Sequence, residues 1–223
     1  MRQEVKYVYF VPGLAADVSI FEYIKLPKDK FVTKTLPWKI PTKKETLEAY
    51  AKRMCEEITH TNCILIGVSF GGIMVQEMSK YVDAKLVIIV SSVKSRKELP
   101  KRMEFARKTG VYRLFPTRII SQIGDWEKLA IGSFAKKRAV MYQKYLSVKD
   151  RGYLDWAIEK IIQWEPKEVS SKLIHIHGNN DIVFPIKNID NCILVEGGTH
   201  VMIINRARWF NEKLPEIIED NLQ

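Results

Sequence analysis

The feature that most constrains the fold of this chain is an apolar run that passes directly into a serine between glycines. Residues 64–72 read Ile-Leu-Ile-Gly-Val-Ser-Phe-Gly-Gly, and further apolar residues follow at helical spacing. This pattern predicts a buried strand, a sharp turn at Ser69 and a helix that begins without a linker. A serine on such a turn adopts a strained backbone, and Gly67 and Gly71 leave room for it. The turn therefore predicts a nucleophile whose hydroxyl stands clear of the sheet, next to the backbone N–H of Phe70.

Glycine-rich turns between a strand and a helix also bind phosphate, or simply allow close packing. A phosphate-binding P-loop ends in Gly-Lys-Ser or Gly-Lys-Thr, and a dinucleotide site contains Gly-x-Gly-x-x-Gly. Residues 67–71 match neither pattern. Because the motif alone leaves both a nucleophile and a packing turn open, the interpretation depends on residues elsewhere in the chain.

Six short apolar runs predict strands, and helical patterns lie between them. The runs are Lys6–Val11, Phe31–Thr35, Cys63–Val68, Lys85–Val90, Lys172–His177 and Asn191–Val195. Several are continuous rather than alternating, which is typical of strands that helices cover on both faces. The alternation of strands and helices predicts an α/β fold, a three-layer αβα sandwich around a mostly parallel sheet of about six strands.

Two helices carry specific expectations about where they begin and end. Thr42 and Glu45 form a capping-box pattern ahead of an apolar stripe at 3.6-residue spacing, which predicts a helix that starts at Thr42. Residues 201–219 predict a C-terminal helix. Because proline lacks the N–H that a helix interior needs, we expect Pro215 to break or kink this helix.

Residues 94–166 interrupt the alternation of strands and helices. They contain helical patterns without a strand-like run, which predicts a helical cap inserted into an α/β core formed by residues 1–93 and 167–223. Within them, residues 94–151 hold 16 Lys and Arg against 5 Asp and Glu, so the net charge of +10 is concentrated there. Such a block can attract an acidic carrier protein, anionic lipid or a charged substrate, and solvated amphipathic helices have the same composition. Nucleic acid is not expected as a partner, because the aromatic residues follow helical spacing rather than forming a stacking platform.

The cysteines and the N-terminal residues indicate the compartment. Cys55, Cys63 and Cys192 are odd in number and contain no Cys-x-x-Cys pair, which argues against a disulfide scaffold and against a zinc site. The first residues lack the apolar core of a signal peptide, and no segment approaches membrane-spanning length. We therefore expect a cytoplasmic protein that needs no metal, no cofactor and no membrane span.

A serine nucleophile needs a base that takes its proton, and histidine is suited to this near neutral pH. We expect His60 at an exposed helix end, His175 in the core and His177 beneath a turn. His200 follows Gly197-Gly198-Thr199 directly after the last predicted strand, and active sites of parallel sheets gather at that edge. His200 is therefore the predicted general base.

The base in turn needs a carboxylate that fixes its tautomer. Asp181 lies in the loop after the strand that ends at His177, where a turn aspartate or a helix cap is the alternative role. Asp190 precedes a strand and so belongs to the other sheet edge, and Glu196 is close to His200 in the sequence. Asp181 is therefore the predicted orienting carboxylate.

The chain order Ser69, Asp181, His200, together with Gly-x-Ser-x-Gly between a strand and a helix, resembles the α/β-hydrolase superfamily. The resemblance covers almost the whole chain outside the cap. It includes residues 10–14, Phe-Val-Pro-Gly-Leu, where many members have His-Gly in place of this Pro-Gly. It implies a trimmed core without the N-terminal hairpin of larger members. It also implies a second oxyanion donor at the backbone N–H of Leu14, beside that of Phe70.

The chain is most similar in this respect to small bacterial serine hydrolases of the esterase or thioesterase type. The resemblance implies that a small-molecule ester or thioester is cleaved through an acyl-enzyme on Ser69. Serine at this position argues against dehalogenases and epoxide hydrolases, which carry aspartate there. One alternative is a biosynthetic thioesterase or esterase whose basic cap docks carrier-linked or carboxylated substrates, and another is a non-catalytic ligand-binding member. Trp126, Trp156 and Trp164 either line the substrate pocket or pack within the cap.

Overall fold

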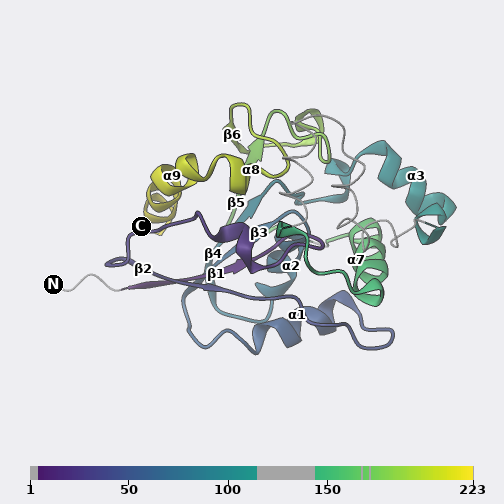
Figure 1. Ribbon diagram of the computed structural model, residues 1–223, viewed down its shortest axis with the longest axis horizontal. Coiled ribbons are helices and arrows are strands. Elements are labelled where there is room, and N and C mark those ends of the chain that lie inside the picture. Colours follow the sequence, from purple (N-terminus) through teal and green to yellow (C-terminus); the bar gives the residue numbers. More distant parts are fainter. Residues whose placement is uncertain (1–4, 115–143, 167, 171, 223) are drawn as a thin grey trace.

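A six-stranded sheet forms the centre of the molecule in a computed structural model, which describes residues 5–114, 144–166, 168–170 and 172–222 (Figure 1). The strand order is β2-β1-β3-β4-β5-β6, and each neighbouring pair is parallel. The strands are β1 (Lys6–Val11), β2 (Phe31–Thr35), β3 (Cys63–Val68), β4 (Ala84–Val90), β5 (Leu173–Gly178) and β6 (Ile193–Val195). The predicted parallel α/β sheet is confirmed. The observed strands differ from the predicted runs by at most two residues at either end.

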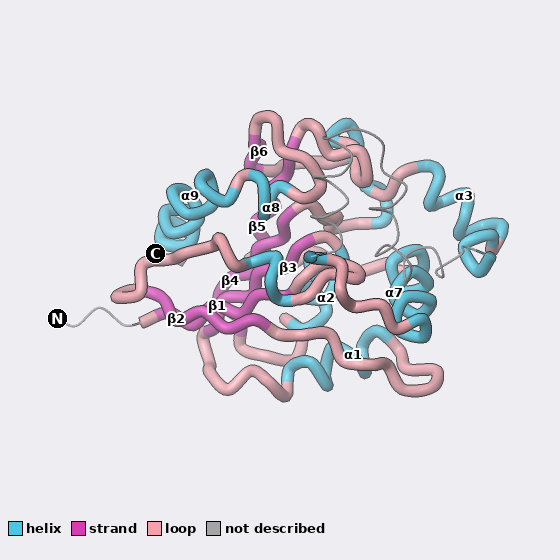
Figure 2. Tube along the Cα trace, viewed as in Figure 1, coloured by secondary structure: helices cyan, strands magenta, loops and turns pink. Residues whose placement is uncertain are grey.

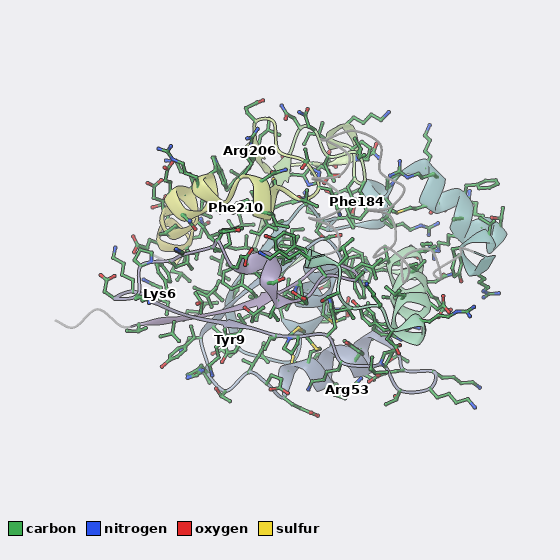
Figure 3. All side chains as sticks on the ribbon, in the orientation of Figure 1. Lys6, Tyr9, Arg53, Phe184, Arg206 and Phe210 are labelled. Atoms are coloured by element: carbon green, nitrogen blue, oxygen red, sulfur yellow. The ribbon has the colours of Figure 1, made fainter. Side chains whose placement is uncertain are left out.

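Helices cover both faces of the sheet, which explains why its strands are continuously apolar. Tyr9 and Leu65 point into one hydrophobic cluster, with α1 (Leu47–Cys55), α2 (Phe70–Met78) and α7 (Arg151–Gln163). The strand residues adjacent to Tyr9 and Leu65 along the chain point to the opposite face of the sheet. There they join a second hydrophobic cluster, in which Phe210 is fully buried. That cluster includes η1 (Val18–Phe21), α8 (Met202–Asn205) and α9 (Ala207–Asp220). Figure 3 labels Tyr9 and Phe210 on these two opposite faces.

Helix α1 begins four residues later than the sequence predicted. Its N-cap is Thr46, whose hydroxyl accepts a hydrogen bond from the N–H of Ala49 at 3.1 Å. Glu45 does accept from the N–H of Thr42 at 2.7 Å, but this bond closes a turn ahead of the helix. Lys44, between these residues, has a φ of 60°, which an α-helix does not accommodate. Arg53 also binds the Glu45 carboxylate through two nitrogens, at 2.8 and 2.9 Å. The capping-box expectation was therefore wrong about the helix start, although the predicted apolar stripe is buried.

The C-terminal helical segment is divided at Arg206 rather than at Pro215. Helix α8 ends at Asn205, and α9 continues through Pro215 as far as Asp220. A proline inside a helix removes one hydrogen bond. Burial of Phe210 and Leu214 on the same face of α9 offsets that loss. Pro215 therefore does not break this helix, and the kink that the sequence offered as the alternative stays a prediction.

In the described parts of segment 94–166, the regular elements are helical. They are η2 (Arg96–Glu98), α3 (Lys101–Thr109), η3 (Val111–Leu114) and α7. Outside this segment, a short helix η5 (Ile186–Asn188) follows β5. Helix α7 buries Tyr153, Leu154 and Trp156 against the core, whereas α3 buries none of its residues. Figure 2 shows α3 and α7 together at one side of the sheet. The cap boundaries at 94 and 166 stay a prediction.

The three cysteines carry free thiols, and Cys63 is fully buried in β3. Burial raises the pKa of the Cys63 thiol to about 11 and that of Cys55 to about 12, so both stay protonated at neutral pH. Among the residues that the structure describes, no helix is long and apolar enough to cross a membrane.

Candidate active site

Ser69 occupies the turn between β3 and α2 with a backbone conformation that side chains rarely adopt. Its φ is 54° and its ψ is −117°, a conformation that costs on the order of 1–3 kcal/mol for a residue with a Cβ. Two hydrogen bonds hold it there. The N–H of Ser69 donates to the carbonyl of Val90 at 2.9 Å, and the hydroxyl of Ser92 donates to the carbonyl of Ser69 at 2.7 Å. Both partners come from the end of β4 and the residues just after it, so the neighbouring strand fixes the turn.

The glycines around Ser69 are needed because other backbone segments pass very close to them. A Cβ on Gly67 would lie 2.1 Å from the carbonyl oxygen of Gly71. One on Gly71 would lie 2.3 Å from the carbonyl oxygen of Val11 at the end of β1. No side chain fits at either distance, and backbone atoms cannot move aside cheaply. The two glycines therefore let the turn pack against both its own helix and the end of β1.

Ser69, His200 and Asp181 form one continuous chain of hydrogen bonds. The Nε2 atom of His200 lies 2.9 Å from the Oγ atom of Ser69, and its Nδ1 atom lies 2.9 Å from Oδ2 of Asp181. An ionised carboxylate only accepts hydrogen bonds, so Nδ1 carries the proton and Nε2 is left to accept from the serine. The structure thus brings together the three residues that the sequence singled out, in the orientation that proton abstraction needs.

The loops that carry Asp181 and His200 touch through their glycines. A Cβ on Gly178 would lie 2.2 Å from the carbonyl oxygen of Gly198, and the N–H of Asn180 donates to that same carbonyl at 2.9 Å. This contact joins the end of β5 to the loop after β6. The two loops, which leave the same edge of the parallel sheet, are therefore held against each other.

The other histidines and carboxylates that competed for these roles lie elsewhere. His60 is half-buried outside α1, where its ring stacks on Tyr7 at 3.4 Å between centroids. Glu196 accepts a hydrogen bond from the side-chain amide of Asn179. Asp190 is exposed, and its backbone contacts Glu98 and Lys94 rather than His200. None of them contacts the serine.

The peptide group between Gly13 and Leu14 lies beside the serine. A Cβ on Gly13 would lie 3.4 Å from the Cβ of Ser69. The Gly13 carbonyl accepts hydrogen bonds from the indole N–H of Trp38 at 2.9 Å and from the N–H of Ala16 at 3.1 Å. Since C=O and N–H point in opposite directions across a trans peptide, the N–H of Leu14 points away from Trp38. Phe70 is the first residue of α2, so its N–H has no partner inside the helix.

No protein-family model and no curated protein matches the chain. Solved structures do match it, among them one of the carboxylesterases of the thaumarchaeon Nitrososphaera gargenis, with 16% identity and a TM-score of 0.69 over 98% of this chain and 91% of that one. An esterase from Exiguobacterium antarcticum has 14% identity and a TM-score of 0.66 over 98% and 93%. A bromoperoxidase from Bacillus anthracis has 17% identity and a TM-score of 0.66, again over 98% and 93%.

The chain has the α/β-hydrolase fold. The matches cover nearly the whole of it, and the structural neighbours named above share that fold. At such low identities, and with esterases and a bromoperoxidase among the matches, the likeness establishes the architecture and leaves the reaction to be argued from the site.

Two features of this α/β-hydrolase-fold site were not found from the sequence. Trp38 stacks on Phe70 with 5.0 Å between ring centroids and donates to the Gly13 carbonyl, but it follows β2 in a stretch without a motif. Ser92 braces the Ser69 carbonyl, and Gly72 makes room for it, since a Cβ there would lie 2.5 Å from the Ser92 Cβ. The second glycine of the Gly71-Gly72 pair was the one available signal.

The two tryptophans of segment 94–166 that the structure describes are mostly buried, and Trp156 also borders a surface pocket beside Tyr112. Trp156 is buried, donates to the Glu45 carbonyl at 2.8 Å and meets the Phe70 ring edge-on. Trp164 is also buried and donates to the Glu77 carboxylate at 2.9 Å. Trp126 lies outside the described residues. Within the described ranges, no group of three or more His, Cys, Asp or Glu residues gathers that could hold a metal ion.

Asp181 is ionised in this site although its side chain is fully buried. Burial raises the pKa of the carboxyl, but the hydrogen bond with His200 and the one from the Phe184 N–H outweigh it, so the pKa of Asp181 is lowered. The buried His177 lies next to Asp181. Its Nε2 atom is 2.8 Å from the Phe184 carbonyl oxygen and 3.7 Å from Oδ2 of Asp181. Burial lowers the pKa of His177, which keeps its ring neutral.

His175 makes the stability of the fold depend on pH. Burial, with His177 adjacent, lowers the pKa of His175 to about 3, whereas an unfolded histidine titrates near about 6.5. Below about pH 6.5 the unfolded chain therefore binds one more proton, so the free energy of unfolding falls as pH drops toward 3. The slope from this residue approaches about 1.4 kcal/mol per pH unit.

We expect the His175→Gln variant to lose this share of the slope, while keeping the smaller share of His177. Urea unfolding at a series of pH values between 4.5 and 7.5 measures the difference. If wild type and variant lost stability at the same rate on acidification, His175 would not be the buried neutral group described above.

Proposed function

We propose that this protein hydrolyses carboxylic esters or thioesters through an acyl-enzyme on Ser69. The observation that carries the proposal is the unbroken hydrogen-bond chain from Asp181 through His200 to the Ser69 hydroxyl. A serine hydroxyl is a weak nucleophile until an adjacent base takes its proton. The hydrogen-bonded residues supply the base, His200, and the carboxylate that orients it, Asp181. The esterase and carboxylesterase among the similar folds are consistent with the same class of reaction.

In the proposed acylation step, the Oγ atom of Ser69 attacks the carbonyl carbon while Nε2 of His200 takes the hydroxyl proton. The tetrahedral intermediate collapses when the bond to the alcohol or thiol breaks, and His200 gives its proton to that leaving group. A water molecule then attacks the acyl-enzyme, again losing a proton to His200, and the carboxylic acid leaves as Ser69 regains its hydrogen. Asp181 stays ionised throughout and stabilises the imidazolium.

The negative charge on the intermediate needs donors that are fixed before the reaction starts. The N–H of Phe70 is a suitable donor, because it belongs to the residue after Ser69 and to the positive end of α2. The N–H of Leu14 is the proposed second donor. Trp38 and Ala16 support that role, since they bind the Gly13 carbonyl and so hold the shared peptide group in one orientation.

The Ser69→Ala variant should lose ester hydrolysis by ~10⁴-fold or more, because it lacks the nucleophile while keeping the fold. The measurement is kcat/KM for short-chain p-nitrophenyl esters. Ser79→Ala is the matched control, since Ser79 caps the far end of the same helix and its hydroxyl donates to the Gln76 carbonyl. Equal activity of Ser69→Ala and wild type would refute the proposal, whereas the control should stay within a few-fold of wild type.

A second candidate function keeps this chemistry, with an acyl group carried on an acidic acyl carrier protein as the substrate. It is favoured by α3, which has no buried residue and exposes Lys101 and Lys108. Phe105 on the same helix is 64% exposed. A basic helix with an exposed aromatic ring suits a partner of opposite charge, through faster encounter and better complementarity.

If a carrier protein docks on α3, reversing the charge of Lys101 and Lys108 together should slow turnover of carrier-linked thioesters by roughly tenfold or more at low salt. Hydrolysis of p-nitrophenyl acetate should be unchanged. The double variant Lys25→Glu with Lys28→Glu, at two exposed lysines outside α3, controls for the same change in net charge. An equal loss on both substrates, or no loss on the carrier-linked one, would exclude this docking mode.

A further inference from the structure

The loop that carries Asp181, residues 181–184, is held by side chains on both of its sides. On the inner side, the Oδ1 atom of Asp181 accepts hydrogen bonds from the N–H groups of Val183 and Phe184, at 2.8 and 2.9 Å. On the outer side, Nη2 of Arg102 donates to the carbonyls of Ile182 and Val183, at 3.0 and 2.7 Å. We call these four residues the acid loop.

These contacts involve the same two peptide groups. The Ile182 carbonyl and the Val183 N–H belong to one peptide plane, and the Val183 carbonyl and the Phe184 N–H belong to the next. In a trans peptide the C=O and N–H point in opposite directions. The guanidinium of Arg102 therefore meets the two oxygen ends, and the carboxylate of Asp181 meets the two hydrogen ends. Both peptide dipoles are aligned between a positive and a negative charge.

This alignment strengthens each bond in the series. A charged donor makes a hydrogen bond shorter and stronger than a neutral one, and hydrogen bonds in a chain polarise one another. Arg102 thus acts on Asp181 through two peptide groups, although the two side chains do not touch. The third carbonyl of the acid loop, that of Phe184, lies 2.8 Å from the buried Nε2 of His177.

Packing alone does not anchor the outer side of the acid loop. The side chain of Ile182 is 76% exposed, so it contributes little burial there. Phe184 is buried and meets the His200 ring edge-on, with 5.5 Å between the ring centroids. Arg102 comes from the first turn of α3, 80 residues earlier in the chain. It joins a helix of the predicted cap to the loop that carries the Asp181 carboxylate.

We propose that Arg102 is a positioning residue of the active site, which fixes the orientation of the Asp181 carboxylate through the two peptide groups of the acid loop. The proposal rests on the proposed function, because it assigns Arg102 a part in the same proton transfer. Loss of the guanidinium frees the two peptide planes to rotate, so the carboxylate holds His200 less firmly. Small misplacements of a reacting group are costly, and we expect kcat to fall roughly tenfold. KM should hardly change, since Arg102 acts on Asp181 and not on the substrate.

The test compares Arg102→Gln with Arg107→Gln, the same substitution on the same helix. Arg107 is the matched control, because its guanidinium binds Glu165 rather than the acid loop. With p-nitrophenyl acetate, kcat of Arg102→Gln should fall roughly tenfold with KM within twofold, and Arg107→Gln should match wild type. Arg102→Lys keeps a cation that reaches one carbonyl, so its kcat should lie between those of Arg102→Gln and wild type. An unchanged kcat in Arg102→Gln, or an equal loss in Arg107→Gln, would overturn the proposal.

A second measurement does not depend on turnover. The proton on Nδ1 of His200, held by Asp181, should give a low-field proton NMR signal that His200→Gln removes. Arg102→Gln should broaden or abolish this signal, while Arg107→Gln should preserve it. If wild type cleaved no ester but the signal responded in this way, the proposed function would fail and the positioning role would stand. If ester cleavage were present and the signal unchanged in Arg102→Gln, the positioning role alone would fail.

Discussion

The close approach of the β3–α2 turn to the end of β1 is the constraint on which the rest of the site depends. Gly71 lies against the Val11 and Pro12 carbonyls at distances that exclude any Cβ. This contact seats the first turn of α2 directly on the sheet. Ser69 is left as the half-buried residue of a turn whose neighbours are buried. Its positive φ costs free energy, and bonds from the neighbouring strand keep it in place. The strain and the exposure of the hydroxyl have the same structural cause.

The parallel sheet brings the remaining groups to this serine. All strands point the same way, so the loops after β1, β3, β5 and β6 emerge at one edge. A second close glycine contact, between Gly178 and Gly198, then joins the loops that carry Asp181 and His200. Burial of the Asp181 carboxylate would favour its neutral form, and hydrogen bonds from the imidazole and from the backbone N–H of Phe184 reverse that preference. The geometry of the backbone and the charge state of the carboxylate therefore support one another.

Local patterns in the sequence were sufficient for the sheet and for the three residues of the hydrogen-bond chain. Continuous apolar runs marked the strands, and glycines next to Ser69 and His200 marked the places where loops approach closely. Contacts that cross long stretches of chain left no such pattern. Trp38 reaches Gly13 over 25 residues and Arg102 reaches the acid loop over 80, and nothing in their neighbours indicates either partner. The predicted start of α1 was wrong because Lys44 adopts a positive φ, which no residue pattern at that position indicates.

The central claim is that Ser69 is an activated nucleophile, and reaction with a fluorophosphonate tests it most directly, because such a probe needs an activated serine and no knowledge of the natural substrate. Mass spectrometry of the intact protein and of its peptides reports how many serines react and which ones. The structure predicts a single adduct on Ser69 in the wild type and none in Ser69→Ala or after prior unfolding. An unmodified protein, or an adduct on a different serine, would contradict the claim.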